Sequence, residues 1–223
     1  MIRRYSVLTG VIISFILLLV AISLYPGGSM FDKNAVGFDW SRNFISNLFA
    51  IKALNGSPNP ARIWACAGML ILPCSYALFF IHMAGKIPDK KIGAVLKYGG
   101  LINILFMFLI VTPLHDLMLN ISITVFWTCI CFITGIILKT KLHLFKIICI
   151  LCLLIFYFSI YLWATNDWIL LPLMQKLNFI DSTLLILGLE YFTGKDDYAL
   201  VLQKRSNKRR KNAYLNEGVD KIE

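Results

Sequence analysis

Six long apolar blocks constrain this chain more than any other feature of its sequence. They cover residues 6–25, 63–84, 92–111, 117–138 and 144–164, with a sixth between residues 171 and 192. A helix needs about 20 mostly apolar residues to cross a bilayer, because the hydrocarbon core is about 30 Å thick. Only 15% of the residues are charged, against about 25% in soluble domains. The blocks therefore predict an all-α polytopic integral membrane protein, built as a bundle of six transmembrane helices.

The periodicity of the blocks excludes a membrane β-barrel. Barrel strands alternate between apolar and polar residues, whereas the segment from Ile147 to Ile160 is apolar on every face. The first block follows Arg3 and Arg4, as in a signal peptide, but it is longer than a signal-peptide core and no small-residue cleavage site follows it. We expect it to remain as the first helix of the bundle.

The basic residues predict the orientation of the chain. Of its 22 Lys and Arg residues, 17 lie in the N-terminus, in or within a few residues of the connections after the second and fourth blocks, and in the tail. Under the positive-inside rule these segments are cytoplasmic, and so are both termini. We expect a membrane domain over residues 1–194 and a basic cytoplasmic tail over residues 195–223. The tail contains Lys204 to Lys211, and we expect it to contact anionic lipid headgroups and not nucleic acid.

The connection over residues 26–62 is predicted to be a long structured loop on the outer side, since connections of this length often carry function. Within it, residues 39–49 have the spacing of an amphipathic helix, with Asp39 as a plausible N-cap. The apolar face would contain Trp40, Phe44, Ile45, Leu48 and Phe49. The opposite face would present Arg42, Asn43, Ser46 and Asn47.

A second set of polar residues is expected at the same end of the bundle. His115 and Asp116 lie in the short outer turn that leads into the fourth block. Asn120, Thr124 and Thr128 continue from Asp116 at intervals of four, which places these four residues on one helical stripe. Hydrocarbon cannot satisfy polar groups, so this stripe is predicted to face the bundle interior. The sixth block adds Gln175, Lys176 and Asp181.

Two interpretations of this cluster stay open. It is either an outward-facing polar pocket walled by the loop, or a charge-paired network that locks the loop to the bundle. In the first, His115 transfers a proton or binds a ligand, and Asp116 fixes its tautomer or pairs with a base from the loop or the sixth block. The candidate catalytic residues are His115 and Asp116, and the candidate ligand-binding residues are Asp39, Arg42, Asn43, Ser46, Asn120, Lys176 and Asp181.

The function expected from these residues is the binding or processing of a lipid or small polar ligand at the outer face. A non-catalytic scaffold or accessory protein is the alternative, and a small-solute transporter is a weaker one, because no span is broken by Gly or Pro around midplane charges. The residues do not decide whether the protein is an enzyme. Cys149 and Cys152 have a redox spacing but an apolar setting, so we expect them to pack the core. We expect no metal and no cofactor, since three convergent ligands cannot be named.

Four short motifs resemble domain-of-unknown-function family 998, a group of prokaryotic membrane proteins distantly similar to the Frag/DRAM/Sfk group. They are Tyr25-Pro26-Gly27-Gly28-Ser29, Asn43 to Leu48, Gly56-x-x-Asn59-Pro60 and Pro113-x-His115-Asp116. Family members often carry aspartate where this chain has Asn47 and glycine where it has Phe49. The resemblance implies a six-helix fold in a bacterial cytoplasmic (inner) membrane, and it implies no established activity.

Overall fold

All the regular secondary structure in the described part of the chain is helical. A computed structural model describes residues 5–110, 112 and 114–199. Its helices are α1 (Ser6–Leu24), the short 3-10 helix η2 (Ile45–Phe49), α2 (Ala61–Lys86), α3 (Lys90–Leu109), α4 (His115–Ile137), α5 (His143–Ala164) and α6 (Leu171–Phe192). The all-α prediction is confirmed, and each predicted block coincides with one long helix.

Five helices, α1 to α5, are long and apolar enough to cross a membrane, which indicates a multi-pass membrane protein. The helix α6 is not among them. Gln175, Lys176, Asn178 and Asp181 lower the hydropathy of its first half. The predicted count of six spans therefore depends on α6.

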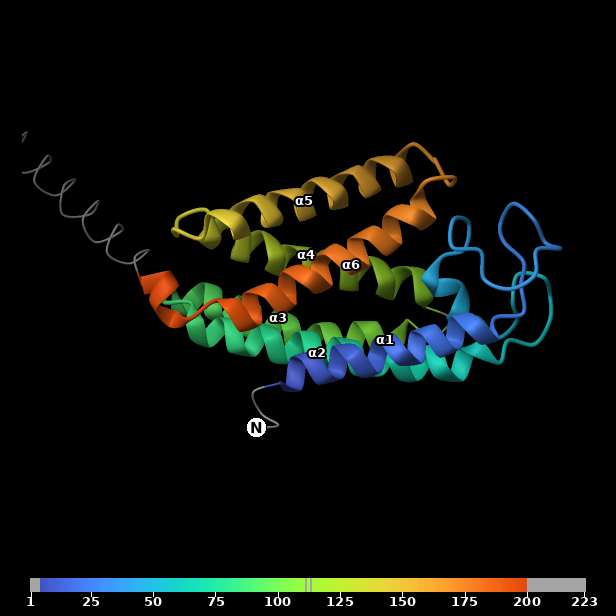
Figure 1. Ribbon diagram of the computed structural model, residues 1–223, viewed down its shortest axis with the longest axis horizontal. Coiled ribbons are helices and arrows are strands. Elements are labelled where there is room, and N and C mark those ends of the chain that lie inside the picture. Colours follow the sequence, from blue (N-terminus) through green and yellow to red (C-terminus); the bar gives the residue numbers. More distant parts are fainter. Residues whose placement is uncertain (1–4, 111, 113, 200–223) are drawn as a thin grey trace, which may run out of the picture.

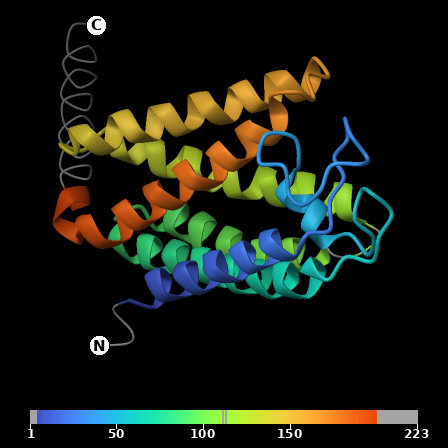
Figure 2. The same cartoon turned by 45° about the vertical axis from the view of Figure 1, so that its right-hand side comes forward.

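The long helices lie side by side, with their axes roughly along the longest dimension of the molecule (Figure 1). The connection between α1 and α2 lies at one end, which we call the loop end (Figures 1 and 2). The start of α1 and the end of α6 lie at the other, which we call the tail end. Among consecutive long helices, α1 and α2 pack most extensively and α4 and α5 least. The fold is thus a bundle that is looser between α4 and α5 than elsewhere.

Small residues bring α1 and α2 close together. The Ser14 hydroxyl of α1 donates a 2.8 Å hydrogen bond to the carbonyl oxygen of Gly68 on α2. A Cβ atom at Gly68 would lie 3.1 Å from the Ser14 carbonyl oxygen, so a larger residue there would push the helices apart. Close backbone approach through small residues is a common way for helices to associate in lipid.

The tail end is closed by polar contacts between α2 and α6. Lys86 Nζ donates to the carbonyl oxygens of Leu189 and Glu190 at 2.9 and 2.7 Å. Both carbonyls belong to the last turn of α6, where the helix has no further backbone N–H groups to bond them. His82 Nδ1 lies 2.6 Å from Glu190 Oε1, whose side chain is only 8% exposed. Three side chains therefore fix the end of α6 to α2.

The predicted tail begins inside the bundle. Residues 195–199 continue the chain after α6, and Tyr198 is fully buried in the core. Its hydroxyl lies 2.8 Å from that of Thr193. Burial is the main cause that raises the pKa of Tyr198 to about 12. The basic segment Lys204 to Lys211 lies outside the described residues.

The predicted amphipathic helix over residues 39–49 is wrong. The chain makes a turn at Asp39, extended backbone at Asn43 and Phe44, and then only the five residues of η2. Asn47 Oδ1 accepts a 2.7 Å hydrogen bond from the Phe44 backbone N–H. Such side-chain bonds satisfy backbone groups that a helix would otherwise use, and so they compete with helix formation.

Two glycines shape the loop that follows α1. Gly27 and Gly28 have φ values of +134° and +83°, a region that residues with a Cβ rarely adopt. A Cβ at Gly28 would also lie 2.3 Å from the backbone nitrogen of Asn55. The backbone segments at Gly28 and Asn55 can approach each other this closely only because Gly28 has no side chain.

Replacing Gly28 with alanine should destabilise the loop strongly. We expect Gly28→Ala to cost about 3 kcal/mol, because backbone strain and a backbone clash add together. Gly56→Ala is the matched control, since Gly56 has a φ of +89° but open space around it, and strain alone should cost about 1 kcal/mol. Thermal unfolding of both variants in detergent measures the difference. Equal unfolding temperatures would show that the close approach at Gly28 is unimportant.

Candidate functional site

Lys176 is the centre of the polar cluster at the loop end. It lies in the second turn of α6 and is only 7% exposed. Its Nζ donates to the carbonyl oxygens of Asn43 and Pro172 at 2.6 and 2.9 Å, and it lies 5.5 Å from the centre of the Phe38 ring. A buried ammonium is tolerated when acceptors replace its water. Lys176 therefore joins α6 to the loop.

Asparagine and glutamine side chains hold the loop backbone around this lysine. Asn43 is fully buried, and its Nδ2 donates to the Gly28 carbonyl while its Oδ1 accepts from the Asp39 N–H, both at 2.8 Å. Gln175 Oε1 accepts a 2.8 Å bond from the backbone N–H of Ile45. The sequence had suggested an exposed helical face for Asn43 and Ser46. Instead, Asn43 lies inside the loop and Ser46 is half-buried.

Asp39 organises the turn at the surface of the cluster. Its Oδ1 accepts hydrogen bonds from the Ser41 hydroxyl at 2.6 Å and from the Ser41 N–H at 2.8 Å. The bond from the Ser41 hydroxyl is the main cause that lowers the pKa of the Asp39 carboxyl. Arg42 Nε lies 3.9 Å from Asp39 Oδ2 on an exposed surface, where such pairs contribute little stability. Asp39 and Arg42 therefore define a turn at the surface of the loop.

His115 and Asp116 lie apart from these contacts. His115 Nδ1 is 2.8 Å from the carbonyl oxygen of Ile110. A carbonyl only accepts, so Nδ1 carries the proton, and Nε2 is the basic nitrogen of the neutral ring. Asp116 is exposed, and within the described residues no hydrogen bond or ion pair connects either side chain with Arg42 or Lys176. The catalytic assignment of His115 and Asp116 stays a prediction.

The polar stripe of α4 does not face the bundle interior. Asp116, Asn120, Thr124 and Thr128 are all exposed, which corrects the orientation expected from the sequence. The buried face of α4 contains larger apolar side chains, among them Trp127, Ile130, Ile133 and Ile137. The helix therefore buries its bulkier face and directs the polar stripe outward.

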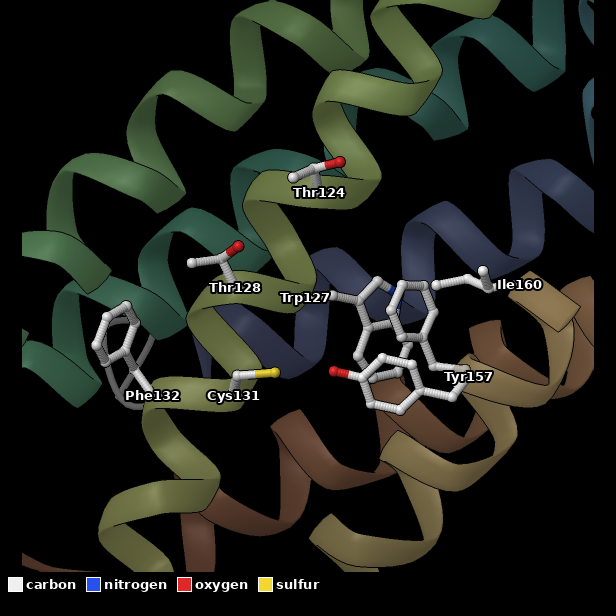
Figure 3. Close-up of a pocket in the computed structure, with 8 residues that line it drawn as sticks. Thr124, Trp127, Thr128, Cys131, Phe132, Tyr157 and Ile160 are labelled. Atoms are coloured by element: carbon white, nitrogen blue, oxygen red, sulfur yellow. The ribbon is translucent and has the colours of Figure 1, made fainter. Parts of the chain in front are cut away.

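This stripe leads into a groove between α4 and α5, with a volume of about 440 Å³. Figure 3 shows its lining, which consists of Thr124, Trp127, Thr128, Cys131 and Phe132 from α4 and Phe156, Tyr157 and Ile160 from α5. Trp127 and Phe156 stack at its base, with ring centres 4.1 Å apart. The Tyr157 hydroxyl is directed toward the Cys131 side chain (Figure 3). The groove thus combines aromatic walls with hydroxyl and thiol groups.

Asp181 also lies away from the loop, at the middle of α6. Both of its carboxyl oxygens are buried and have no hydrogen-bond partner among the described residues. The structure therefore places Asp39 and Arg42 at the surface of the loop and joins Lys176 to the loop at Asn43. It places Asp116 and Asn120 on the exposed face of α4 and leaves Asp181 in the bundle.

Several residues of the groove were not identifiable from the sequence. Trp127, Phe156 and Tyr157 belong to apolar blocks in which core-facing and lipid-facing residues look alike. Asn178 was also missed, although its spacing of three residues from Asp181 puts the two on one helical face. Among residues 5–110, 112 and 114–199, no group of three His, Cys, Asp or Glu side chains could hold a metal ion.

Comparison of the chain with protein-family models, with curated proteins and with solved structures finds no match.

Removing the ammonium of Lys176 should release the loop from α6. We expect Lys176→Met to lower the free energy of loop opening by about 2 kcal/mol, because two carbonyl oxygens lose a charged donor. Amide hydrogen exchange over residues 26–60 should then rise ~30-fold.

Lys33→Met is the matched control for this change. Lys33 lies in the same loop but is exposed, so its loss should leave exchange unchanged. Unaltered protection in Lys176→Met would mean that the loop is held by its own hydrogen bonds and not by α6.

Proposed function

We propose that this protein binds a membrane lipid, or an amphiphile of similar shape, in the groove between α4 and α5. One observation carries the proposal: the polar stripe from Asp116 to Thr128 is exposed on a helix that is apolar enough to cross a membrane, and it continues into an aromatic groove. Hydrocarbon offers no hydrogen bonds to such a stripe. A ligand with a polar end and an apolar chain satisfies both halves of this surface.

The order of residues along α4 gives the orientation of the ligand. Asp116 and Asn120 are in the first two turns, and Thr128, Cys131 and Phe132 follow further along the helix. We propose that the polar end of the ligand lies at Asp116 and Asn120, and that its chain lies against Trp127 and Phe156. His115 would then be adjacent to the polar end, where the basic Nε2 of its neutral ring is suited to proton transfer if the ligand is also processed.

The placement in the membrane belongs to the same proposal. We propose that α6 also crosses the bilayer, and that both termini are cytoplasmic in a bacterial inner membrane. The distribution of Lys and Arg along the sequence and the resemblance to family 998 support this placement. The contact of the basic tail with anionic headgroups is proposed on the same ground.

A bulky residue in the groove should displace the ligand. Thr128→Trp fills the space between α4 and α5, and we expect it to reduce the lipid retained by the purified protein about tenfold, which corresponds to about 1.4 kcal/mol. Native mass spectrometry of the protein released from detergent measures retained lipid directly.

Ile147→Trp is the control for added bulk. Ile147 is 66% exposed on α5 and lies outside the groove, so this variant should retain lipid like the wild type. Equal retention in both variants would reject the groove. If Thr128→Trp instead changed the mass of an oligomer or removed a protein partner, the stripe would be a protein interface, as expected of a scaffold.

The exposed carboxylate of Asp116 should select the headgroup. A headgroup with an ammonium can pair with a carboxylate, whereas an anionic headgroup is repelled by it. We expect phosphatidylethanolamine to bind more tightly than phosphatidylglycerol by about fivefold, or about 1 kcal/mol. Asp116→Asn should remove this preference while leaving binding of the chain intact. A preference that survives in Asp116→Asn would place the headgroup elsewhere.

A further inference from the structure

Three buried acceptor oxygens without donors lie on one face of α6. They are Asp181 Oδ1, Asp181 Oδ2 and Asn178 Oδ1, and none has a hydrogen-bond partner within the described residues. Asn178 and Asp181 are three residues apart, so they share a helical face. The Asn178 amide nitrogen is already engaged, because Nδ2 donates to Ser159 Oγ at 2.5 Å and to the Met174 carbonyl at 3.0 Å. The set therefore consists of acceptors alone.

Among the described residues, no positively charged group acts on the Asp181 carboxylate. The Cys152 thiol of α5, which is only a weak donor, and the Tyr76 hydroxyl of α2 interact with Asp181, and Cys149 interacts with Cys152. None of these carries a positive charge. The Tyr76 hydroxyl is 2.6 Å from Thr183 Oγ1, and that threonine donates to the Phe179 carbonyl. Neither α1 nor η2, which also pack near α6, contains a titratable residue.

An ionised carboxylate in this position would be costly. A buried charge without a partner loses its hydration and gains nothing in return, which amounts to several kcal/mol. A single proton removes the charge and also creates a donor, since the carboxyl O–H can then donate to an acceptor such as Asn178 Oδ1. One proton therefore removes the charge and supplies a donor for one of the orphaned acceptors.

We propose that Asp181 is a proton-binding site inside the bundle, with Asn178 as the acceptor for its O–H. The site is separate from the groove and does not depend on the lipid proposal. It lies at the interface of α5 and α6, where Asn178 contacts Ser159 of α5. Release of the proton leaves a charge between these two helices, so binding of the proton holds α5 against α6.

Dicyclohexylcarbodiimide tests the proposal on the full chain in detergent. This apolar reagent reacts with protonated carboxyls: the carboxyl O–H adds across a C=N bond, and the adduct rearranges to a stable N-acylurea with no leaving group. We expect one reagent per chain at neutral pH, mapped by peptide mass spectrometry to Asp181. Labelling should fall as the pH rises and the carboxyl ionises. Glu190 is an internal control, because it is buried beside His82 and Lys86 and should stay unlabelled.

Asp181→Asn is the matched variant, since it keeps the shape of the side chain and cannot ionise. It should lose the label, and its thermal stability in detergent should stay flat at alkaline pH, where that of the wild type falls. Three outcomes would overturn the proposal. These are no label at Asp181, a label that is independent of pH, or a label that is blocked by sodium ions at constant pH, which would assign the site to Na⁺.

Discussion

The helices of this protein are arranged around one constraint, which is that apolar surroundings supply no hydrogen bonds. Several polar side chains on the helices solve this locally by donating to a carbonyl one turn earlier, as Ser75, Ser159 and Thr183 do. Others use the same need to join helices. The Ser14 hydroxyl bonds α1 to α2, and the Lys86 ammonium bonds α2 to the end of α6. Satisfying polar groups and fixing the packing are thus the same process here.

The loop end shows how far this constraint shapes the chain. The residues that first suggested a ligand pocket are used to hold backbone: Asn43 and Gln175 bond the loop, and Lys176 is saturated by two carbonyls and an aromatic face. Of the two interpretations open from the sequence, the geometry of these residues favours the network that locks the loop to α6. Gly28 and Asn43 meet in a single hydrogen bond, so both residues shape the loop.

The sequence was sufficient to predict the helices and insufficient to orient them. The ends of α1 to α6 follow from hydropathy and from breakers such as Pro26 and Pro88, which lie just outside helices. The outward direction of Thr124 and Thr128 could not be predicted, because the core and the lipid are equally apolar and the usual contrast between faces is absent. The helix expected over residues 39–49 was wrong for a local reason. The side chains of Asn43 and Asn47 accept hydrogen bonds from backbone N–H groups of the loop. These bonds compete with those of a helix, and the spacing of apolar residues carries no information about them.

Two of the sets of polar groups that the helices leave unsatisfied lie on either side of α5. On one side, Phe156 and Tyr157 line the groove below the exposed stripe of α4. On the other, Ser159 contacts Asn178 beside Asp181. The helices α4 and α5 share less contact than any other consecutive pair of long helices, so α5 depends on α6 for most of its packing. A ligand in the groove would add contacts between α5 and α4, and a proton at Asp181 would remove a charge from the interface of α5 with α6, so both would hold α5 more firmly in the bundle.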